Sequence, residues 1–221
     1  MSFEGFPDEG LVFYEGLEAD NSKTYWTRHR AAFESTVRAP MQALLEELAL
    51  EFGTAKVFRP YRDVRFSHDK TLYKTHHGAV VNPDGRGAGA WYVQLSADGL
   101  MVAGGCWRLA SDQVDRYRRA VADAVQGARL RREVDRLAAA GWVLGGERLT
   151  RLPSGYDVVE DRADLLRHKS LSATREWEPA DWLHDRRALD EVRRAWRDLT
   201  ALNAWLADNV GATTTEPRPR R

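Results

Sequence analysis

Positively charged side chains are concentrated in one short segment of the chain, between residues 56 and 77. Six Lys and Arg residues face two Asp residues there: Lys56, Arg59, Arg62, Arg65, Lys70 and Lys74, with Asp63 and Asp69. Like charges repel, so a folded chain holds such a cluster only where carboxylates or a bound anion offset it. Two carboxylates neutralise two of the six cations, which leaves four for other partners. Because guanidinium groups bind phosphate and carboxylate oxygens through paired hydrogen bonds, the segment predicts a site for a small anionic ligand.

Eight residues are candidates for contact with this ligand. They are Arg59, Arg62, Asp63, Arg65, Lys70, Tyr73, Lys74 and Lys169. Asp63 lies among three arginines, which lower the pKa of its carboxyl and suit it to orienting them rather than to accepting a proton. Lys169, with Arg167 and His168, completes the site from a second segment. A solvated edge strand is the alternative interpretation of those three residues.

Lys70 and Tyr73 are the candidate catalytic residues if the ligand is turned over. A Tyr beside a Lys forms a proton-transfer pair, because the ammonium lowers the pKa of the phenol. Such neighbours are common, so binding without chemistry is the preferred interpretation, and whether the protein is an enzyme stays open. A purely structural role is a further alternative, in which the Arg–Asp lattice holds the fold or serves an interaction module.

The other residues that could carry chemistry do not form a recognisable site. His76 and His77 are adjacent, so in a strand their rings point to opposite faces, and together with His68 they lack a metal-binding spacing. We therefore expect surface or loop histidines, no metal and no cofactor. The glycines between residues 85 and 89 precede a predicted strand rather than a helix, which indicates a mobile loop and not a dinucleotide site.

Aromatic residues near the middle of the chain support a second hypothesis, nucleic-acid binding. Trp91, Tyr92 and Trp107 could stack on bases while the basic segment contacts phosphates, although aromatic strand residues are more often part of a core. The chain has 33 basic and 33 acidic residues, and hence no net charge to attract a polyanion. Residues 1–22 hold six acids and no Lys or Arg, so they could dock against the basic segment. A small ligand is therefore preferred over nucleic acid.

Hydrophobic periodicity predicts helices at both ends of the chain and strands between them. N-terminal helices are expected around Phe13 and Leu17, from Asn21 or Ser22 to Phe33, and from Pro40 to Gly53. Strands are expected over residues 57–66 and 78–82, and as a hairpin over 90–96 and 100–107. The rest of the chain is expected to begin with helices, the first capped by Ser111 and the last ending at Gly141. A small hairpin over 142–149, a strand holding residues 167–169 and a helix over 185–209 are expected after them. This order predicts an α+β fold, a central antiparallel sheet flanked by N- and C-terminal helices.

Length and composition predict a single α+β domain over residues 1–210, followed by a disordered basic tail over residues 211–221. The single Cys106 excludes an internal disulfide and fits a reducing compartment. No apolar stretch has the length of a membrane span, and no targeting segment is recognisable at the N-terminus. We expect a cytoplasmic protein with no membrane partner. The sequence does not predict its oligomeric state.

Residues 59–73 match the pattern Arg-x-x-Arg-Asp-x-Arg-Phe-x-x-x-Lys-x-x-Tyr without a departure. This pattern resembles the signature of a bacterial family of conserved hypothetical proteins, the domain-of-unknown-function family numbered 2461. Further similarity lies at residues 17–21, Trp26, Pro40, 152–156 and 165–170, whereas Cys106 and Trp107 depart from an expected Gly and smaller aromatic residue. The resemblance implies a single-domain bacterial protein of about this length and carries no established activity.

Overall fold

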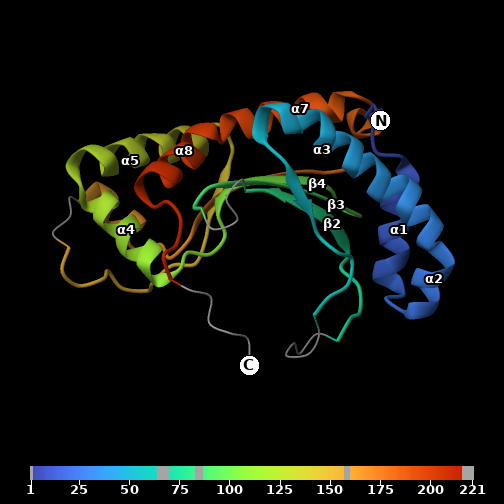
Figure 1. Cartoon of the computed structure of the whole chain (residues 1–221), viewed down its shortest axis with the longest axis horizontal. Coiled ribbons are helices and arrows are strands. Elements are labelled where there is room, and N and C mark those ends of the chain that lie inside the picture. The colour runs from blue at the N-terminus through green and yellow to red at the C-terminus, as the bar shows by residue number, and fades with distance from the viewer. Residues whose placement is uncertain (1, 64–69, 83–86, 157–159, 216–221) are drawn as a thin grey trace. The chain divides into compact units, whose positions relative to one another are not determined.

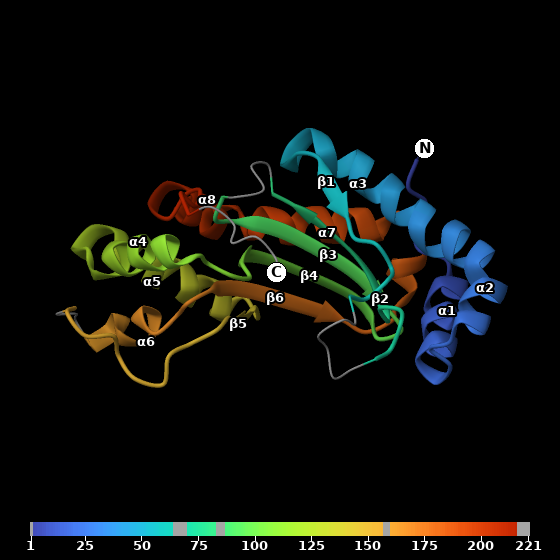
Figure 2. The same ribbon diagram turned by 60° about the horizontal axis from the view of Figure 1, so that its bottom comes forward.

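The computed structural model describes residues 2–63, 70–82, 87–156 and 160–215. Over these residues the fold is α+β, as predicted (Figure 1). Six strands of the described chain form one antiparallel sheet in the order β1-β2-β3-β4-β6-β5 (Figure 2). The strands are β1 (Ala55–Val57), β2 (His76–Val81), β3 (Ala90–Ser96), β4 (Gly99–Cys106), β5 (Val143–Gly145) and β6 (Leu171–Trp177).

The helices lie mainly before and after these strands in the sequence. They are α1 (Asp8–Ala19), α2 (Lys23–Ala32), the π-helical segment η1 (Phe33–Arg38), α3 (Ala39–Phe52), α4 (Ser111–Ala122), α5 (Ala124–Ala139), α6 (Ala163–Leu166), α7 (Arg187–Asp198) and α8 (Thr200–Asn209). Two short 3-10 turns, η2 (Glu160–Arg162) and η3 (Asp181–His184), precede α6 and α7.

The chain forms two compact units, and strands β3, β4 and β6 supply residues to both of them. Unit 1 comprises Met1–Val81, Tyr92–Val102 and Glu176–Ala195; unit 2 comprises Asn82–Trp91, Ala103–Arg175 and Trp196–Arg221. A single domain over residues 1–210 stays a prediction.

In unit 1, one face of the strands packs against helices. Ala79, Val81, Val93 and Leu95 are buried at alternating positions, and α3 and α7 lie along their face of the sheet (Figure 1). The intervening residues of β2 and β3 are half-buried apart from Gly78, as expected for a sheet with one helix-covered face.

Ser22 and Gly53 mark the two ends of one helical run, because α2 continues through η1 into α3 instead of ending at Phe33 as predicted. The Ser22 hydroxyl accepts a hydrogen bond from the Tyr25 amide at 3.1 Å and caps α2. Pro40 lies in the first turn of α3, where a proline has no hydrogen bond to lose. Gly53 ends α3 with a φ of 100°, which glycine adopts readily. The N-terminus contacts the turn before α7, because Asp8 Oδ1 lies 4.0 Å from His184 Nε2 and the Arg186 guanidinium donates to the Phe3 carbonyl at 2.9 Å.

Unit 2 is organised by buried polar side chains between its helices and loops. The buried Arg162 guanidinium donates to the carbonyls of Val121 and Asp123, at 3.1 and 2.7 Å, where α4 turns into α5. Asn203 of α8 accepts from the Gly105 amide at 2.8 Å and donates to the Ala90 carbonyl at 3.1 Å. These bonds satisfy backbone groups that would otherwise be buried without partners.

Three sequence predictions about elements of the C-terminal half are wrong. The predicted hairpin over 142–149 does not form, because β5 pairs with β6 through the register Val143↔Thr174. Arg167, His168 and Lys169 precede β6 instead of lying in it. The predicted helix over 185–209 is two helices, α7 and α8, separated at Leu199. In the first two cases the pairing partner lies far away in the sequence, so local patterns do not identify it.

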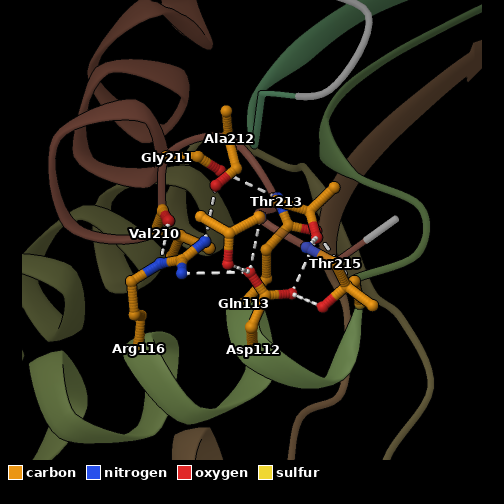
Figure 3. Close-up of polar contacts among 10 residues, drawn as sticks. Asp112, Gln113, Arg116, Val210, Gly211, Ala212, Thr213 and Thr215 are labelled. Atoms are coloured by element: carbon orange, nitrogen blue, oxygen red, sulfur yellow. Dashed lines mark hydrogen bonds and ion pairs between the residues drawn. The ribbon is translucent and has the colours of Figure 1, made fainter. Parts of the chain in front are cut away.

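The chain beyond α8 is held to the start of α4 (Figure 3). The Asp112 carboxylate accepts hydrogen bonds from the hydroxyls of Thr213 and Thr215, at 2.7 and 3.0 Å. These bonds and the Thr214 amide lower the pKa of Asp112. Residues 211–215 of the tail predicted to be disordered are therefore hydrogen-bonded, and residues 216–221 lie outside the described residues.

Ser111 is not the cap of α4, since that position belongs to Ala110.

Candidate functional site

The pairing of β1 with β2 continues beyond the sheet as two adjacent segments, residues 58–63 and 70–75, which we call the basic arm. The arm is held by backbone bonds from the Arg62 amide to the Leu72 carbonyl, 2.9 Å, and from the Lys74 amide to the Pro60 carbonyl, 2.8 Å. Tyr61 and Tyr73 face each other as an antiparallel bridge. The arm therefore places the two described ends of the signature segment, residues 59–63 and 70–73, side by side.

The predicted strand over residues 57–66 is only partly present. The regular strand ends at Val57, and Tyr61 pairs in isolation. Pro60 lies between them and has no amide hydrogen to donate, which interrupts a regular ladder. The part of this prediction that covers residues 64–66 lies outside the described residues.

Tyr73 is clamped by the beginning of α2. The Asn21 side chain forms two hydrogen bonds with the backbone of Tyr73, accepting from its amide at 3.0 Å and donating to its carbonyl at 3.1 Å. The Trp26 ring stacks on the Tyr73 ring with centroids 4.4 Å apart and planes 9° apart. Tyr73 is 4% exposed as a result. Asn21 and Trp26 thus position the arm, a role that the sequence did not predict, although Asn21 was a possible helix cap and both residues lie in the region of family resemblance.

Arg62 donates a side-chain hydrogen bond to a backbone carbonyl of the arm. Its Nε donates to the carbonyl oxygen of Tyr73 at 3.2 Å, the same oxygen that accepts from Asn21. The side chain is half-buried. This bond fixes the guanidinium group beside the Tyr73 backbone.

Lys74 carries its ammonium group into a positively charged environment. Its Nζ lies 5.0 Å from the centroid of the Phe58 ring, in cation–π contact. Partial burial lowers the pKa of Lys74, and the nearby charges of Arg59 and Arg62 lower it further. Arg59 is exposed, whereas Lys74 is half-buried. Three of the predicted ligand-binding residues thus lie within electrostatic reach of one another.

The pKa of the Tyr73 phenol differs from the prediction. A neighbouring ammonium was expected to lower it, but burial and the adjacent Tyr61 raise it instead. The phenol therefore stays protonated at neutral pH and can donate a hydrogen bond. It is not suited to accepting a proton.

The adjacent histidines belong to β2, and the prediction of surface or loop histidines is wrong for His77. Its ring is 2% exposed, and neither ring nitrogen has a hydrogen-bond partner within the described structure. His76 is half-buried, and burial together with Lys74 and Arg62 lowers its pKa. His76 therefore lies beside the cations of the arm, although it was not among the predicted ligand contacts.

The remaining predicted site residues do not join Arg59, Arg62 and Lys74 within the described structure. Asp63 and Lys70 are exposed at the ends of the described parts of the arm. Arg65, together with Phe66 and His68, lies outside the described residues. Lys169 belongs to unit 2, where its Nζ donates to the Glu147 carboxylate at 2.7 Å.

The three aromatic residues considered for base stacking have different environments. The Trp91 indole donates to the Trp196 carbonyl at 2.9 Å, and the Tyr92 hydroxyl donates to Gln94 Oε1 at 2.8 Å. Trp107 is 89% exposed. Within the described residues, no group of three or more His, Cys, Asp or Glu side chains could hold a metal ion.

The fold and the site define the protein as an α+β protein with a cationic arm held beside its sheet. The chain belongs to the family described as conserved hypothetical protein (DUF2461), whose family model matches residues 9–205. This match spans the arm and both clamp residues. Searches of curated proteins and of solved structures found no match. None of the described helices combines the length and apolar character needed to cross a membrane.

Proposed function

We propose that unit 1 binds a small anionic ligand, bearing phosphate or carboxylate, at the basic arm. Lys74, Arg59 and Arg62 supply the positive charge. The observation that carries the proposal is the half-buried Lys74 ammonium, which lies over the Phe58 ring and whose pKa is lowered by burial and by the charges of Arg59 and Arg62. A bound anion would offset the repulsion among these groups and raise the pKa of Lys74 toward its ordinary value.

The other predicted contacts extend this proposal. Asp63 would orient the arginines, and Arg65 and Lys70 would add charge from the turn of the arm. A contact from Lys169, which pairs with Glu147 within unit 2, stays a prediction from the sequence. If the ligand is turned over, Lys70 or Tyr73 would donate the proton, and the raised pKa of Tyr73 is compatible with donation. The single cysteine supports a cytoplasmic location as part of the same proposal.

Calorimetric titration with inorganic phosphate, pyrophosphate, ribose 5-phosphate and citrate tests the proposal. At least one of these anions is expected to bind, and Lys74→Met is expected to weaken it by about tenfold or more, because a charge-assisted bond is lost. The matched control is Arg30→Met, which removes one positive charge from the exposed side of α2 and should leave the affinity unchanged. Absence of binding to all four anions, or equal binding by Lys74→Met, would overturn the proposal.

Stability measurements on the same variants separate a binding role from a purely structural one. Lys74→Met loses a cation–π contact but relieves repulsion, so its free energy of unfolding is expected to stay within about 1 kcal/mol of wild type. Arg62→Met is expected to lose more, because its bond to the Tyr73 carbonyl disappears. A lattice that serves only the fold predicts instead that Lys74→Met is clearly destabilised and that no anion stabilises the wild type.

A further inference from the structure

His76 is the first residue of β2 and lies next to the cations of the basic arm. Side chains alternate along a strand, so His76 points away from the side on which His77 is buried. The charge of Lys74, two residues earlier in the chain, acts on the His76 ring, and so does the charge of Arg62 from the other segment of the arm. His76 therefore shares the electrostatic environment of the arm, whereas His77 belongs to the core.

Three donors of this cluster have no protein partner in the part of the chain that the structure describes. The side chains of Arg59, Lys74 and His76 take part there in no hydrogen bond and no ion pair. The only contact of the Lys74 ammonium among those residues is with the Phe58 ring. Arg59 is exposed, and Lys74 and His76 are half-buried, so all three keep contact with solvent. Each can therefore donate to an anion without giving up a bond within the protein.

The His76 ring is largely neutral in the free protein at pH 7. Burial, followed by the charges of Lys74 and Arg62, lowers its pKa from the ordinary value of 6.5. Among the described groups that act on this ring, none is a carboxylate. A ring that neighbouring cations keep neutral takes up a proton when a bound anion offsets their charge.

We propose that His76 is a contact of the anion at the basic arm, and that the anion binds together with one proton, which the His76 ring takes from solvent. The protonated ring donates to an anionic oxygen beside the Lys74 ammonium and the Arg59 guanidinium. This inference rests on the proposed function, because the arm supplies the permanent charges of the site. It adds a form of regulation, since a ring that is charged only in the complex makes the affinity rise as the pH falls.

The other titratable groups near His76 keep one charge state between pH 6 and pH 8.5, with Lys74 as the exception. His77, on the opposite side of the strand, has a pKa of about 4 and is neutral in this range. Tyr92 of β3, whose hydroxyl lies close to Gly78 of β2, stays protonated because burial raises its pKa to about 12. The pKa of Lys74 is lowered toward this range. A variant at His76, and not the pH dependence alone, must therefore assign the proton.

Calorimetric titration with sulfate tests the inference, together with phosphate, pyrophosphate, ribose 5-phosphate and citrate. Sulfate has the tetrahedral oxygens of phosphate, and its charge is constant between pH 6 and pH 8.5. It is expected to bind about threefold or more tightly at pH 6 than at pH 8.5, because a neighbouring opposite charge shifts a pKa by about one unit or more. Titrations at pH 6.5 in two buffers of different ionisation enthalpy should show uptake of about 0.3 proton or more per anion bound.

Variants assign the proton to the ring. His76→Gln keeps a neutral donor but cannot be protonated, so it should lose most of the pH response and of the proton uptake. For the four anions whose own protonation changes, the difference between wild type and His76→Gln isolates the share of the ring. His76→Arg carries its charge permanently and should bind sulfate at pH 8.5 about as tightly as wild type does at pH 6.

The matched control is His29→Gln, which removes a half-buried histidine that stacks on Tyr25 and should keep the pH response. A nuclear magnetic resonance titration gives a second readout, in which sulfate should raise the pKa of the His76 ring and leave that of His29 unchanged. Circular dichroism and thermal melting confirm that each variant is folded.

The outcomes distinguish this inference from the proposed function. Anion binding that Lys74→Met weakens, but with equal pH response and equal proton uptake in His76→Gln and wild type, would overturn the role of His76 and leave the anion site standing. No binding of any of the five anions, or binding that Lys74→Met leaves unchanged, would overturn both. A pH response that His29→Gln abolishes as fully as His76→Gln would also overturn the assignment to His76.

Discussion

His77 is an unusual residue for a strand core, because it is buried with both ring nitrogens unpartnered. The edge of its ring packs against Phe33 of the π-helical segment, with centroids 5.2 Å apart and planes nearly perpendicular. Burial, together with the charges of Arg38, Lys74 and His76, lowers its pKa from 6.5 to about 4. The imidazole is therefore neutral at physiological pH, and its protonation opposes folding.

This residue predicts a pH dependence of stability. In the unfolded chain His77 binds a proton near pH 6.5, whereas in the folded chain it does so only near pH 4. The contribution of the neutral imidazole to the free energy of unfolding is therefore fully present above pH 6.5 and declines as the pH falls toward 4. The free energy of unfolding falls by about 3 kcal/mol in all, because each unit of pKa difference corresponds to about 1.4 kcal/mol. Denaturant unfolding at pH 7 and pH 4 should show a smaller decline for His77→Leu than for wild type. His29→Leu, which removes a ring stacked on Tyr25, is the control and should keep the decline. Equal declines in His77→Leu and wild type would contradict the prediction.

At the scale of elements, the position of the arm depends on the start of α2. Asn21 pairs with the backbone of Tyr73, and Trp26 covers its ring, so two residues at the beginning of one helix hold a segment 52 residues away. The adjacent Ser22 caps the helix. The same turn thereby begins α2 and orients the arm on which Arg62 and Lys74 lie.

Removal of the clamp should loosen the arm more than the rest of the chain. Asn21→Ala loses two partly buried hydrogen bonds, which predicts a loss of about 1–3 kcal/mol in the free energy of unfolding. Hydrogen exchange at the Tyr73 and Lys74 amides should accelerate, and affinity for the anion should fall with it. Ser22→Ala weakens the helix cap by about 1 kcal/mol and is the matched control, because it leaves the contacts of Tyr73 in place. Unchanged exchange at Tyr73 in Asn21→Ala would show that the clamp does not hold the arm.

The elements that the sequence predicts correctly are those with local signals. Ser22 and Gly53 mark the helix ends through their own backbone chemistry, and the turn at residues 97–98 joins β3 to β4 as expected. The errors concern pairing. The segment after Trp142 was expected to fold on itself, but β5 finds its partner in β6, and no local pattern encodes that choice.

The charged residues of the candidate site could be predicted from the sequence, but the residues that hold them in position could not. Arg59, Arg62 and Lys74 were identified by residue type and spacing, and the structure places them within electrostatic reach. The packing of Trp26 on Tyr73 and the burial of His77 depend on contacts between distant segments, so periodicity alone does not reveal them. The only signal was the occurrence of Asn21 and Trp26 in the region of family resemblance.

At the scale of the whole molecule, the equal numbers of acidic and basic residues restrict the kind of ligand. With 33 residues of each sign, the chain has no net charge at pH 7, and its positive potential at the arm is local. A small anion needs only that local charge. A nucleic acid contacts several phosphates in a row and requires a more extended positive surface.

This difference predicts the salt dependence of binding. Raising NaCl from 50 to 200 mM should weaken the binding of ribose 5-phosphate only a few-fold, because one anion meets a few cations over distances shorter than the screening length. Single-stranded DNA of about 12 nucleotides is the comparison. A protein that neutralises three or more phosphates of a single strand loses about 20-fold or more in affinity over the same range, with a log–log slope of about −2 or steeper. We expect no saturable binding of the oligonucleotide at either salt concentration. Saturable binding with that steep slope, weakened by Lys74→Met, would instead identify the arm as part of a nucleic-acid interface.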